Sequence, residues 1–330
     1  MIIKTFDNGW GPEYPAKQLE NRLLGSTYSR LIGCKKRYAV INSVWYSEDY
    51  HQSTVLPYLK NHAIDGIVLV ALLDAAIPRP EWFSHFAPVY TVGYYPGTGF
   101  LDYWALFLSS YFQSPHLTDI ARADTIARPF MCLNRKPHWH RVKLYNQLKS
   151  LNLTSAGIVS LGGENTAPVQ TIDDDVDIVN LTPNAGLEQN GIPNDISSLG
   201  NIAKWQQCFF NVVTETVYDI NSQYFVSEKI YKPILGMRPF VVYAPDGGTQ
   251  WLTDRGFETY HRDFQDITDK DPSQPKNVAE FLQTLAEQPK TYWQKKFLEL
   301  SEKLVYNKNH FGTYVDQQRK KATEGLLCLT

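Results

Sequence analysis

The sequence predicts an α/β protein with two Rossmann-like domains whose polar loops face one cleft. Apolar, strand-like runs alternate with segments of helical spacing along most of the chain, which is typical of α/β folds. The pattern weakens over residues 113–128 and starts afresh at residue 129, and a length of 330 residues corresponds to about two domains. We therefore predict an N-terminal domain over residues 1–125 and a C-terminal domain over residues 126–330.

In the first domain, apolar runs predict four strands and periodic spacing predicts two helices. The strands are 2–6, 38–44, 66–73 and 89–93, and the helices are 15–24 and 51–62. The run 66–73 is apolar throughout, as in a strand that is buried on both faces of a parallel sheet. Asp7 and Asp74 follow the first and third strands, so we expect both carboxylates in loops at the edge of the sheet.

The second domain repeats the alternation of strands and helices. Strands are predicted at 129–133, 158–161, 208–213 and 239–243, and helical segments at 138–151, 247–254 and 278–304. Residues 164–201 are rich in Asn, Pro, Gly and Asp and are too long for a plain connection, so we interpret them as irregular. Residues 305–327 are expected to pack back across the first domain.

Composition and charge exclude several classes of protein. With 43% hydrophobic and 20% charged residues and a formal net charge of -2, the chain is typical of ordinary soluble domains. The chain has no overall basic field to hold nucleic acid. A nucleic-acid partner is therefore possible through a local basic patch but is not favoured. The four cysteines lie far apart, and neither a signal-peptide pattern nor a membrane-spanning apolar run is present, so we expect a cytoplasmic location, or the host cytoplasm if the protein is viral.

The stretch 205–260 carries the main functional signal. A buried strand ends at Thr214-Glu215, and a polar loop leads to Ser227, which can cap a short helix that Gly236 ends. Another buried strand follows at once, so the unit predicts a right-handed crossover in a parallel sheet. The helix start and two lysines, Lys229 and Lys232, would then lie beside the carboxyl edge of the sheet, which is typical of a site for a phosphorylated ligand.

Cationic side chains of the second domain follow its strands at positions where a diphosphate would lie. They are Arg135, Lys136, Arg141, Lys229 and Lys232. Charge-assisted hydrogen bonds contribute ~1.5–3 kcal/mol each, so a few of them would hold a nucleoside diphosphate. Glu228 does not suit phosphate, but its carboxylate can accept hydrogen bonds from neighbouring sugar hydroxyls. Together they predict a site for a nucleotide sugar.

These residues resemble a known family. Glu215, the run Phe225-Val226-Ser227-Glu228-Lys229-Ile230-Tyr231, Gly236 and the strand from Pro239 look like the donor-binding signature of α1,3-fucosyltransferases and related viral and bacterial glycosyltransferases. The chain has Phe225 where that signature has tyrosine, Thr216 where it has asparagine, and a longer spacing between Glu215 and Glu228. The resemblance covers residues 130–260 at best, and it leaves the sugar and the base of the donor open.

The resemblance implies a fold and a set of roles. The fold is GT-B, in which two Rossmann-like domains face each other. Glu228 would bind donor hydroxyls, Lys229 the diphosphate, and Glu215 would support the pocket, while Arg141 matches an arginine that grips phosphate. The predicted donor-binding set is Arg135, Arg141, Glu215, Ser227, Glu228, Lys229 and Lys232.

Simpler interpretations stand beside these roles. Glu228 and Lys229 can also form an ordinary solvated first turn of a helix, since acidic residues suit helix N-termini. The run 173–175 is acidic, but a surface location is favoured over a metal site, so we expect no divalent metal and no cofactor. His138, Trp139 and His140 lack the spacing of zinc ligands and are expected to pack or to contact the donor base.

Catalysis would require a group on the first domain if the reaction inverts the anomeric centre. A carboxylate must then take the proton of the acceptor hydroxyl, and Asp74 and Asp7 rank first among the candidates, ahead of Glu13 and Asp49. A retaining reaction needs no such base. For each aspartate, capping or solvation is the competing role.

The sequence therefore predicts a glycosyltransferase that moves a sugar from a nucleoside-diphosphate donor to a hydroxyl of a glycan or a lipid-linked saccharide. Two alternatives remain. One is a transferase that glycosylates a hydroxymethylated base in DNA, which would need a basic, aromatic-lined groove. The other is a protein that binds nucleotide sugars without turnover.

Overall fold

The computed structural model divides the chain into two compact units, each with its own sheet. Unit 1 comprises Met1–Phe107 and Tyr314–Thr330, and unit 2 comprises Leu108–Thr313. The boundary that we predict from the sequence, after residue 125, lies farther along the chain. The structure describes residues 2–6, 36–42, 50–70, 83–92, 102, 105, 108–109, 112, 117–134, 137–161, 199–216, 218, 226–244, 248–264 and 271–327.

Unit 1 contains a four-stranded parallel sheet whose strands lie in chain order. The strands are β1 (Ile2–Phe6), β2 (Tyr38–Asn42), β3 (Gly66–Val70) and β4 (Val89–Val92), and the order in the sheet is β1-β2-β3-β4. All four coincide with predicted strands. In β2 and β3, Ala39, Ile41, Ile67 and Leu69 belong to one buried cluster, which explains why these runs are apolar.

The helix predicted over residues 51–62 is present, with a distorted beginning. It starts as a π-helical turn, η1 (His51–Val55), and continues as α3 (Leu56–Asn61). Val55 and Leu59 pack into the cluster of β2 and β3. A proline is tolerated in the first turn of a helix, where no backbone N–H is needed, and Pro57 occupies such a position in α3.

Unit 2 also contains a four-stranded parallel sheet, but its strands do not lie in chain order. The strands are β5 (Arg128–Asn134), β6 (Ile158–Leu161), β7 (Cys208–Thr214) and β8 (Phe240–Tyr243), and the order is β6-β5-β7-β8. Every residue of β7 is buried, as expected for a central strand of a covered sheet. With a parallel sheet in each unit, the predicted α/β class with two Rossmann-like domains is confirmed.

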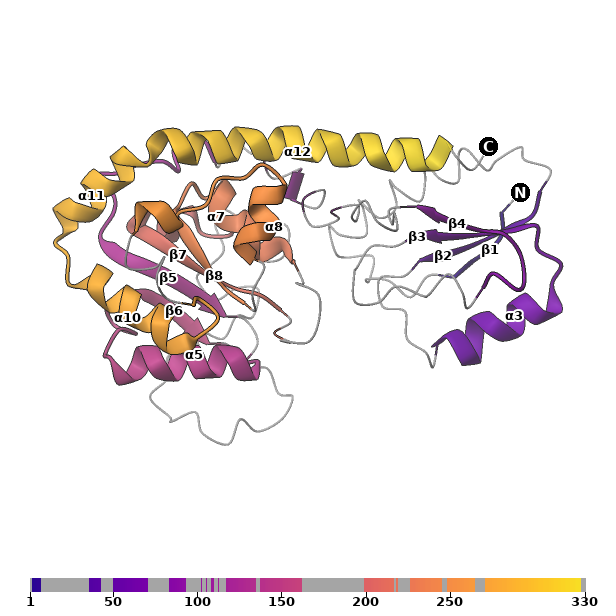
Figure 1. The fold of residues 1–330 in the computed structure, drawn as a ribbon, viewed down its shortest axis with the longest axis horizontal. Helices are drawn as coiled ribbons and strands as arrows, with labels where there is room; N and C mark the ends of the chain where they lie inside the picture. The colour runs from indigo at the N-terminus through magenta and orange to yellow at the C-terminus, as the bar shows by residue number, and fades with distance from the viewer. Residues whose placement is uncertain are drawn as a thin grey trace. The chain divides into compact units, whose positions relative to one another are not determined.

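Helices cover the sheet of unit 2. In Figure 1, α5 (Trp139–Ser150) and α10 (Pro275–Ala286) lie next to each other against this sheet, and the two helices share many contacts. The remaining helical elements are α6 (Ile202–Gln207), η5 (Glu228–Ile230), α7 (Tyr231–Leu235), α8 (Gly248–Asp254), η6 (His261–Asp263) and α11 (Lys290–Glu299). The sequence pattern does not predict α6, although Asn201 caps this helix by accepting a hydrogen bond from the N–H of Ala203.

The predicted helical segment 278–304 consists of three helices. It includes most of α10, all of α11 and the start of α12 (Ser301–Leu327), and Pro289 forms the N-cap of α11. The division between the units falls within α12. In unit 1, Asp102 accepts a hydrogen bond from the hydroxyl of Tyr314 at 3.0 Å and donates its backbone N–H to the side chain of Gln318 at 2.9 Å.

Several predicted positions lie outside the described residues. They are the helix 15–24, the acidic run 173–175, the candidate bases Asp7 and Asp74, and the cationic residues Arg135 and Lys136. Among the helices that the structure describes, none combines the length and the apolar character that crossing a membrane would require.

Candidate functional site

The order of the strands in unit 2 creates a place where a ligand can bind. From β5 the chain passes through α5 to β6 on one side, and it later returns as β7 on the other side of β5. In open parallel sheets, ligands bind at the carboxyl ends of two such neighbouring strands, where the connections leave in opposite directions. Asn134 and Thr214 end β5 and β7, and the hydroxyl of Thr214 donates to Oδ1 of Asn134 at 2.5 Å. The polar residues that follow them define the candidate site.

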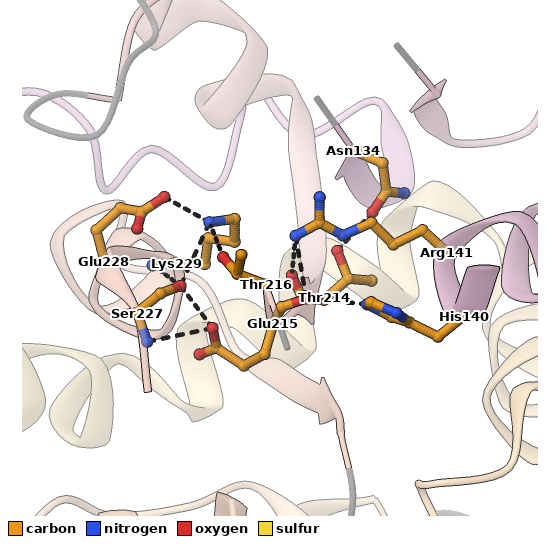
Figure 2. A network of polar contacts seen from close by, with 9 residues as sticks. All are labelled: Asn134, His140, Arg141, Thr214, Glu215, Thr216, Ser227, Glu228 and Lys229. Carbon is orange, nitrogen blue, oxygen red and sulfur yellow. Dashed lines mark hydrogen bonds and ion pairs between the residues drawn. The ribbon is translucent and has the colours of Figure 1, made fainter. Parts of the chain in front are cut away.

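Glu215 follows β7 directly and connects this strand to the short helix η5. Its side chain is fully buried, with 0% of the residue exposed. Oε2 of Glu215 accepts hydrogen bonds from the hydroxyl of Ser227 at 2.5 Å and from the backbone N–H of Ser227 at 3.2 Å (Figure 2). The carboxylate therefore fixes the point at which η5 begins.

Ser227 caps η5, as predicted from the sequence, and its hydroxyl also meets the side chain of Lys229. Oγ of Ser227 accepts from the backbone N–H of Lys229 at 3.4 Å and from its Nζ at 3.3 Å. Nζ of Lys229 also donates to the hydroxyl of Thr216 at 3.0 Å. These contacts hold the ammonium group beside the end of β7 (Figure 2).

Glu228 and Lys229 form a close ion pair. Nζ of Lys229 lies 2.6 Å from Oε1 of Glu228, and the side chains are 24% and 5% exposed, respectively. Burial raises the pKa of Glu228, but the charges of Lys229 and Lys232 and the hydrogen bond from Lys229 together hold this pKa below its usual range. The pair is thus ionised, with the carboxylate enclosed and the ammonium partly open to solvent.

His140 and Arg141, in the first turn of α5, donate to the main chain at the end of β7. Nε2 of His140 lies 2.9 Å from the carbonyl oxygen of Glu215, and Nη2 of Arg141 lies 3.1 Å and 3.0 Å from the carbonyl oxygens of Thr214 and Glu215. Both side chains are buried. They bind the carbonyl groups of the last paired residue of the strand and of the residue after it, and so fix the direction in which the chain leaves the sheet.

Burial dominates the electrostatics of this cluster. It raises the pKa of Glu215 to about 7, although the charge of Lys229 and the hydrogen bonds from Ser227 act in the opposite direction. Burial lowers the pKa of His140 to about 4, and it lowers the pKa of Arg141 against the attraction of Glu215 and Glu228. His140 is therefore neutral near pH 7, and its Nε2 carries the hydrogen because the partner of Nε2 is a carbonyl oxygen.

Aromatic rings adjoin the site on the side of α5. His140 stacks on Tyr218, with ring centroids 5.1 Å apart, and Trp139 meets Tyr218 edge to face at 5.1 Å. Trp139 is 54% exposed, and Nζ of Lys143 lies 4.8 Å from the centre of its ring. The expectation that this segment packs is confirmed for His140, while a contact of Trp139 with a donor base stays a prediction.

Five of the predicted donor-binding residues lie in one network, drawn in Figure 2: Arg141, Glu215, Ser227, Glu228 and Lys229. Lys232 is on α7, and its charge acts on Glu228. The predicted phosphate contact of Arg141 stays a prediction. Asp7, Asp74 and Arg135 lie outside the described residues.

Four further residues belong to the network, although the sequence assigned none of them this role. Asn134 and Thr214 join the ends of β5 and β7, Thr216 contacts Lys229, and His140 contacts the backbone of Glu215. Asn134 could have been found as the first polar residue after a buried strand. Within the described part of the chain, no three residues of the types His, Cys, Asp and Glu gather as a metal ion would require.

Comparisons with known proteins yield only distant similarity. No protein-family model and no curated protein sequence matches the chain. Among solved structures, an alpha,alpha-trehalose-phosphate synthase (UDP-forming) from Burkholderia vietnamiensis matches with a TM-score of 0.32 and 12% identity, over 96% of this chain and 79% of the other. An alpha,alpha-trehalose 6-phosphate synthase from Burkholderia multivorans matches with a TM-score of 0.30 and 12% identity, over 98% and 78%. Similarity at this level does not assign the chain to a family.

Proposed function

We propose that the protein is a GT-B glycosyltransferase that moves a sugar from a nucleoside-diphosphate donor to a hydroxyl of a glycan or a lipid-linked saccharide. The observation that carries the proposal is the ion pair of Lys229 and Glu228, which a buried polar network holds next to the carboxyl ends of β5 and β7. At such a place an ammonium suits a diphosphate and a carboxylate suits sugar hydroxyls. A nucleotide sugar offers both groups on one molecule.

The close pairing of Lys229 and Glu228 also supports an exchange of partners when the donor binds. Each of the two charges has the other as its partner at 2.6 Å. A diphosphate oxygen would replace the carboxylate at Nζ of Lys229, and the freed carboxylate of Glu228 would accept hydrogen bonds from the sugar. Because both charges find new partners in the same ligand, neither is left buried and unpaired.

The residues around this pair would prepare the site. Glu215 and Ser227 fix the start of η5, and Arg141 adds a buried positive charge while it holds the end of β7. The similarity of the run from Phe225 to Tyr231 to the donor signature of α1,3-fucosyltransferases agrees with these roles. Under this proposal the acceptor side, with Asp74 or Asp7 as the base of an inverting reaction, belongs to the first domain.

A panel of nucleotide sugars tests the proposal. Thermal unfolding would be followed with GDP-, UDP-, ADP- and CMP-sugars, because a ligand that binds only the native state raises the unfolding midpoint. We expect one class of nucleoside-diphosphate sugar to raise it in a concentration-dependent way, and slow hydrolysis of this sugar without acceptor would indicate a transferase. If none of the compounds raises the midpoint, the donor site is refuted. Binding without any turnover would instead support a non-catalytic nucleotide-sugar protein.

A further inference from the structure

The two carboxylate oxygens of Glu215 have unequal surroundings. Oε2 accepts two hydrogen bonds from Ser227, whereas Oε1 is buried and has no hydrogen-bond partner among the described residues. An ionised carboxylate spreads its charge over both oxygens, so a buried oxygen without a donor makes the ionised form costly. A proton on Oε1 removes this cost and leaves both hydrogen bonds to Oε2 in place. The geometry thus favours a Glu215 that gains and loses a proton readily.

Ser227 links Glu215 to Lys229. A serine hydroxyl has one hydrogen, and here it points to Oε2 of Glu215. The lone pairs of Oγ are therefore available to Lys229, which donates to Oγ from its backbone N–H and from Nζ. If the hydroxyl turned away from Glu215, its hydrogen would compete with these contacts. Glu215 consequently sets both the orientation of Ser227 and the position of the lysine side chain.

We propose that Glu215 is a positioning residue that acts on Lys229 through Ser227, and that binding of the donor diphosphate at Lys229 is coupled to uptake of one proton by Glu215. This inference rests on the proposed function, because it concerns the same anion. The charged groups that act on Glu215 are Lys229 and Glu228 of η5 and Arg141 on α5. His140 on α5 contacts the backbone carbonyl of Glu215, and Lys232 on the neighbouring α7 acts on Glu228.

The coupling follows from the arrangement of these charges. A diphosphate at Nζ would face the negative charges of both Glu215 and Glu228, and a proton on Glu215 removes one of them. By reciprocity, a proton that strengthens anion binding is itself bound more tightly when the anion is present. Burial raises the pKa of Glu215 to about 7, against the effects of Lys229 and Ser227. The uptake of the proton is therefore expected near neutral pH.

The first arm of the test needs no ligand. Carbon-13 NMR would follow the carboxyl carbon of Glu215 and the Cε of Lys229 through a pH titration, with both signals assigned from Glu215→Gln and Lys229→Gln. We expect both signals to shift with one midpoint, at about 7, because both report the titration of Glu215. In Ser227→Ala the midpoint of Glu215 should move up, because the lost hydrogen bond from the hydroxyl favours the ionised form. A Glu215 that stays ionised to acid pH, or a midpoint unchanged in Ser227→Ala, would overturn the inference.

The second arm measures affinity for the nucleotide sugar that binds best in the panel, since its diphosphate diester does not titrate near neutral pH. We expect binding to the unaltered protein to be about tenfold weaker at pH 8 than at pH 6, with proton uptake visible as a dependence of the calorimetric heat on the buffer. Glu215→Gln resembles the neutral acid and should bind equally well at both pH values, near the affinity of the unaltered protein at pH 6. The same pH profile in both proteins would overturn the coupling.

The two arms separate this inference from the proposed function. If no nucleotide sugar binds, the proposed function fails and the coupling to the donor fails with it, while the first arm still decides whether Glu215 acts on Lys229. If a nucleotide sugar binds with no dependence on pH, only the inference fails. Circular dichroism on Glu215→Gln shows whether the variant is folded. If it is not folded, the titrations of the unaltered protein and of Ser227→Ala decide whether Glu215 acts on Lys229 through Ser227.

Discussion

The hydroxyl of Ser227 lies 2.5 Å from Oε2 of Glu215 and ties the start of η5 to the end of β7. The same hydroxyl caps η5 and accepts from Nζ of Lys229, so one small side chain has three structural roles. Residues that share a hydrogen-bond network respond to substitution as a unit, and their effects do not add.

Replacing Ser227 with alanine should destabilise the protein and weaken donor binding together. The variant loses an N-cap, and Glu215 loses the hydroxyl that binds its buried carboxylate, so the free energy of unfolding should fall by roughly 1–3 kcal/mol. Urea unfolding measures the loss. Ser150→Ala is the matched control, because this exposed hydroxyl donates to the carbonyl oxygen of Gln147 within the same helix, and the change in the free energy of unfolding should stay within about 0.5 kcal/mol. Equal effects in the two variants would contradict the role of Ser227.

Replacing Arg141 with methionine should loosen the end of β7. The buried guanidinium donates to the carbonyl oxygens of Thr214 and Glu215, and methionine would leave both acceptors without this donor. We expect the free energy of unfolding to fall by roughly 2–4 kcal/mol and the affinity for the nucleotide sugar to fall as well.

The control for Arg141 is Arg128→Met, since the Arg128 side chain donates to the carbonyl oxygen of Ser155 at an exposed position. Chemical unfolding and calorimetric titration should separate the two variants clearly. An Arg141→Met protein as stable as Arg128→Met would show that the two carbonyl contacts of Arg141 contribute little.

His140 should make the protein sensitive to mild acid. Its pKa is about 4 in the folded protein because the ring is buried, against 6.5 for an ordinary histidine, so the unfolded chain binds more protons between these values. The contribution of His140 to the free energy of unfolding is fully present above pH 6.5. It is lost as the pH falls towards 4, at up to about 1.4 kcal/mol per pH unit.

Comparison with His140→Gln isolates this effect. Glu215 affects the free energy of unfolding with the opposite sign, because its pKa is raised in the folded protein. Its contribution is largest below pH 4.5 and is lost as the pH rises through about 7. Both proteins contain Glu215, so the difference between their pH profiles of unfolding reports on His140. A difference that does not change between pH 7 and pH 5 would show that His140 is not held neutral in the folded state.

Gly236 should not tolerate a larger side chain. Its φ of -71° is open to any residue, but a Cβ there would lie 2.4 Å from Cε3 of Trp205. The indole is held in place by a hydrogen bond from Nε1 to the carbonyl oxygen of Leu199 at 2.9 Å. Gly236→Ala should lower the free energy of unfolding by roughly 1–3 kcal/mol. If the clash is the cause, Trp205→Leu should cost less in the Gly236→Ala background than alone, and thermal unfolding of the four proteins measures this.

The secondary structure around the site was largely predictable because local chemistry determines it. The run from Cys208 to Val213 is too apolar for anything but a buried element, Ser227 is a strong capping residue, and Gly236 suits the end of a short helix. Each of these predictions depends on a few adjacent residues. The structure confirms them within one or two positions.

The contacts across the site were not predictable in the same way. The pairing of Glu215 with Ser227 and the inward turn of Arg141 depend on the order of β5, β6 and β7, which no local pattern encodes. An arginine in the first turn of a helix after a strand suggests an open, phosphate-facing side chain. In the structure its Nη2 binds the carbonyl groups of Thr214 and Glu215, since these backbone acceptors are buried and need donors, and its contact with phosphate stays a prediction.

The most direct test of the central claim is the affinity of Lys229→Gln for the best-binding nucleotide sugar, measured by calorimetric titration. Glutamine can still donate to Glu228 and Thr216, so the variant removes the charge of Lys229 with little structural disturbance. Lys295→Gln is the control, because the Lys295 side chain is 81% exposed on α11. A charge-assisted hydrogen bond contributes ~1.5–3 kcal/mol, so we predict binding that is roughly 10- to 100-fold weaker in Lys229→Gln and unchanged in Lys295→Gln. Equal affinity in the two variants would contradict the assignment of Lys229 to the donor diphosphate.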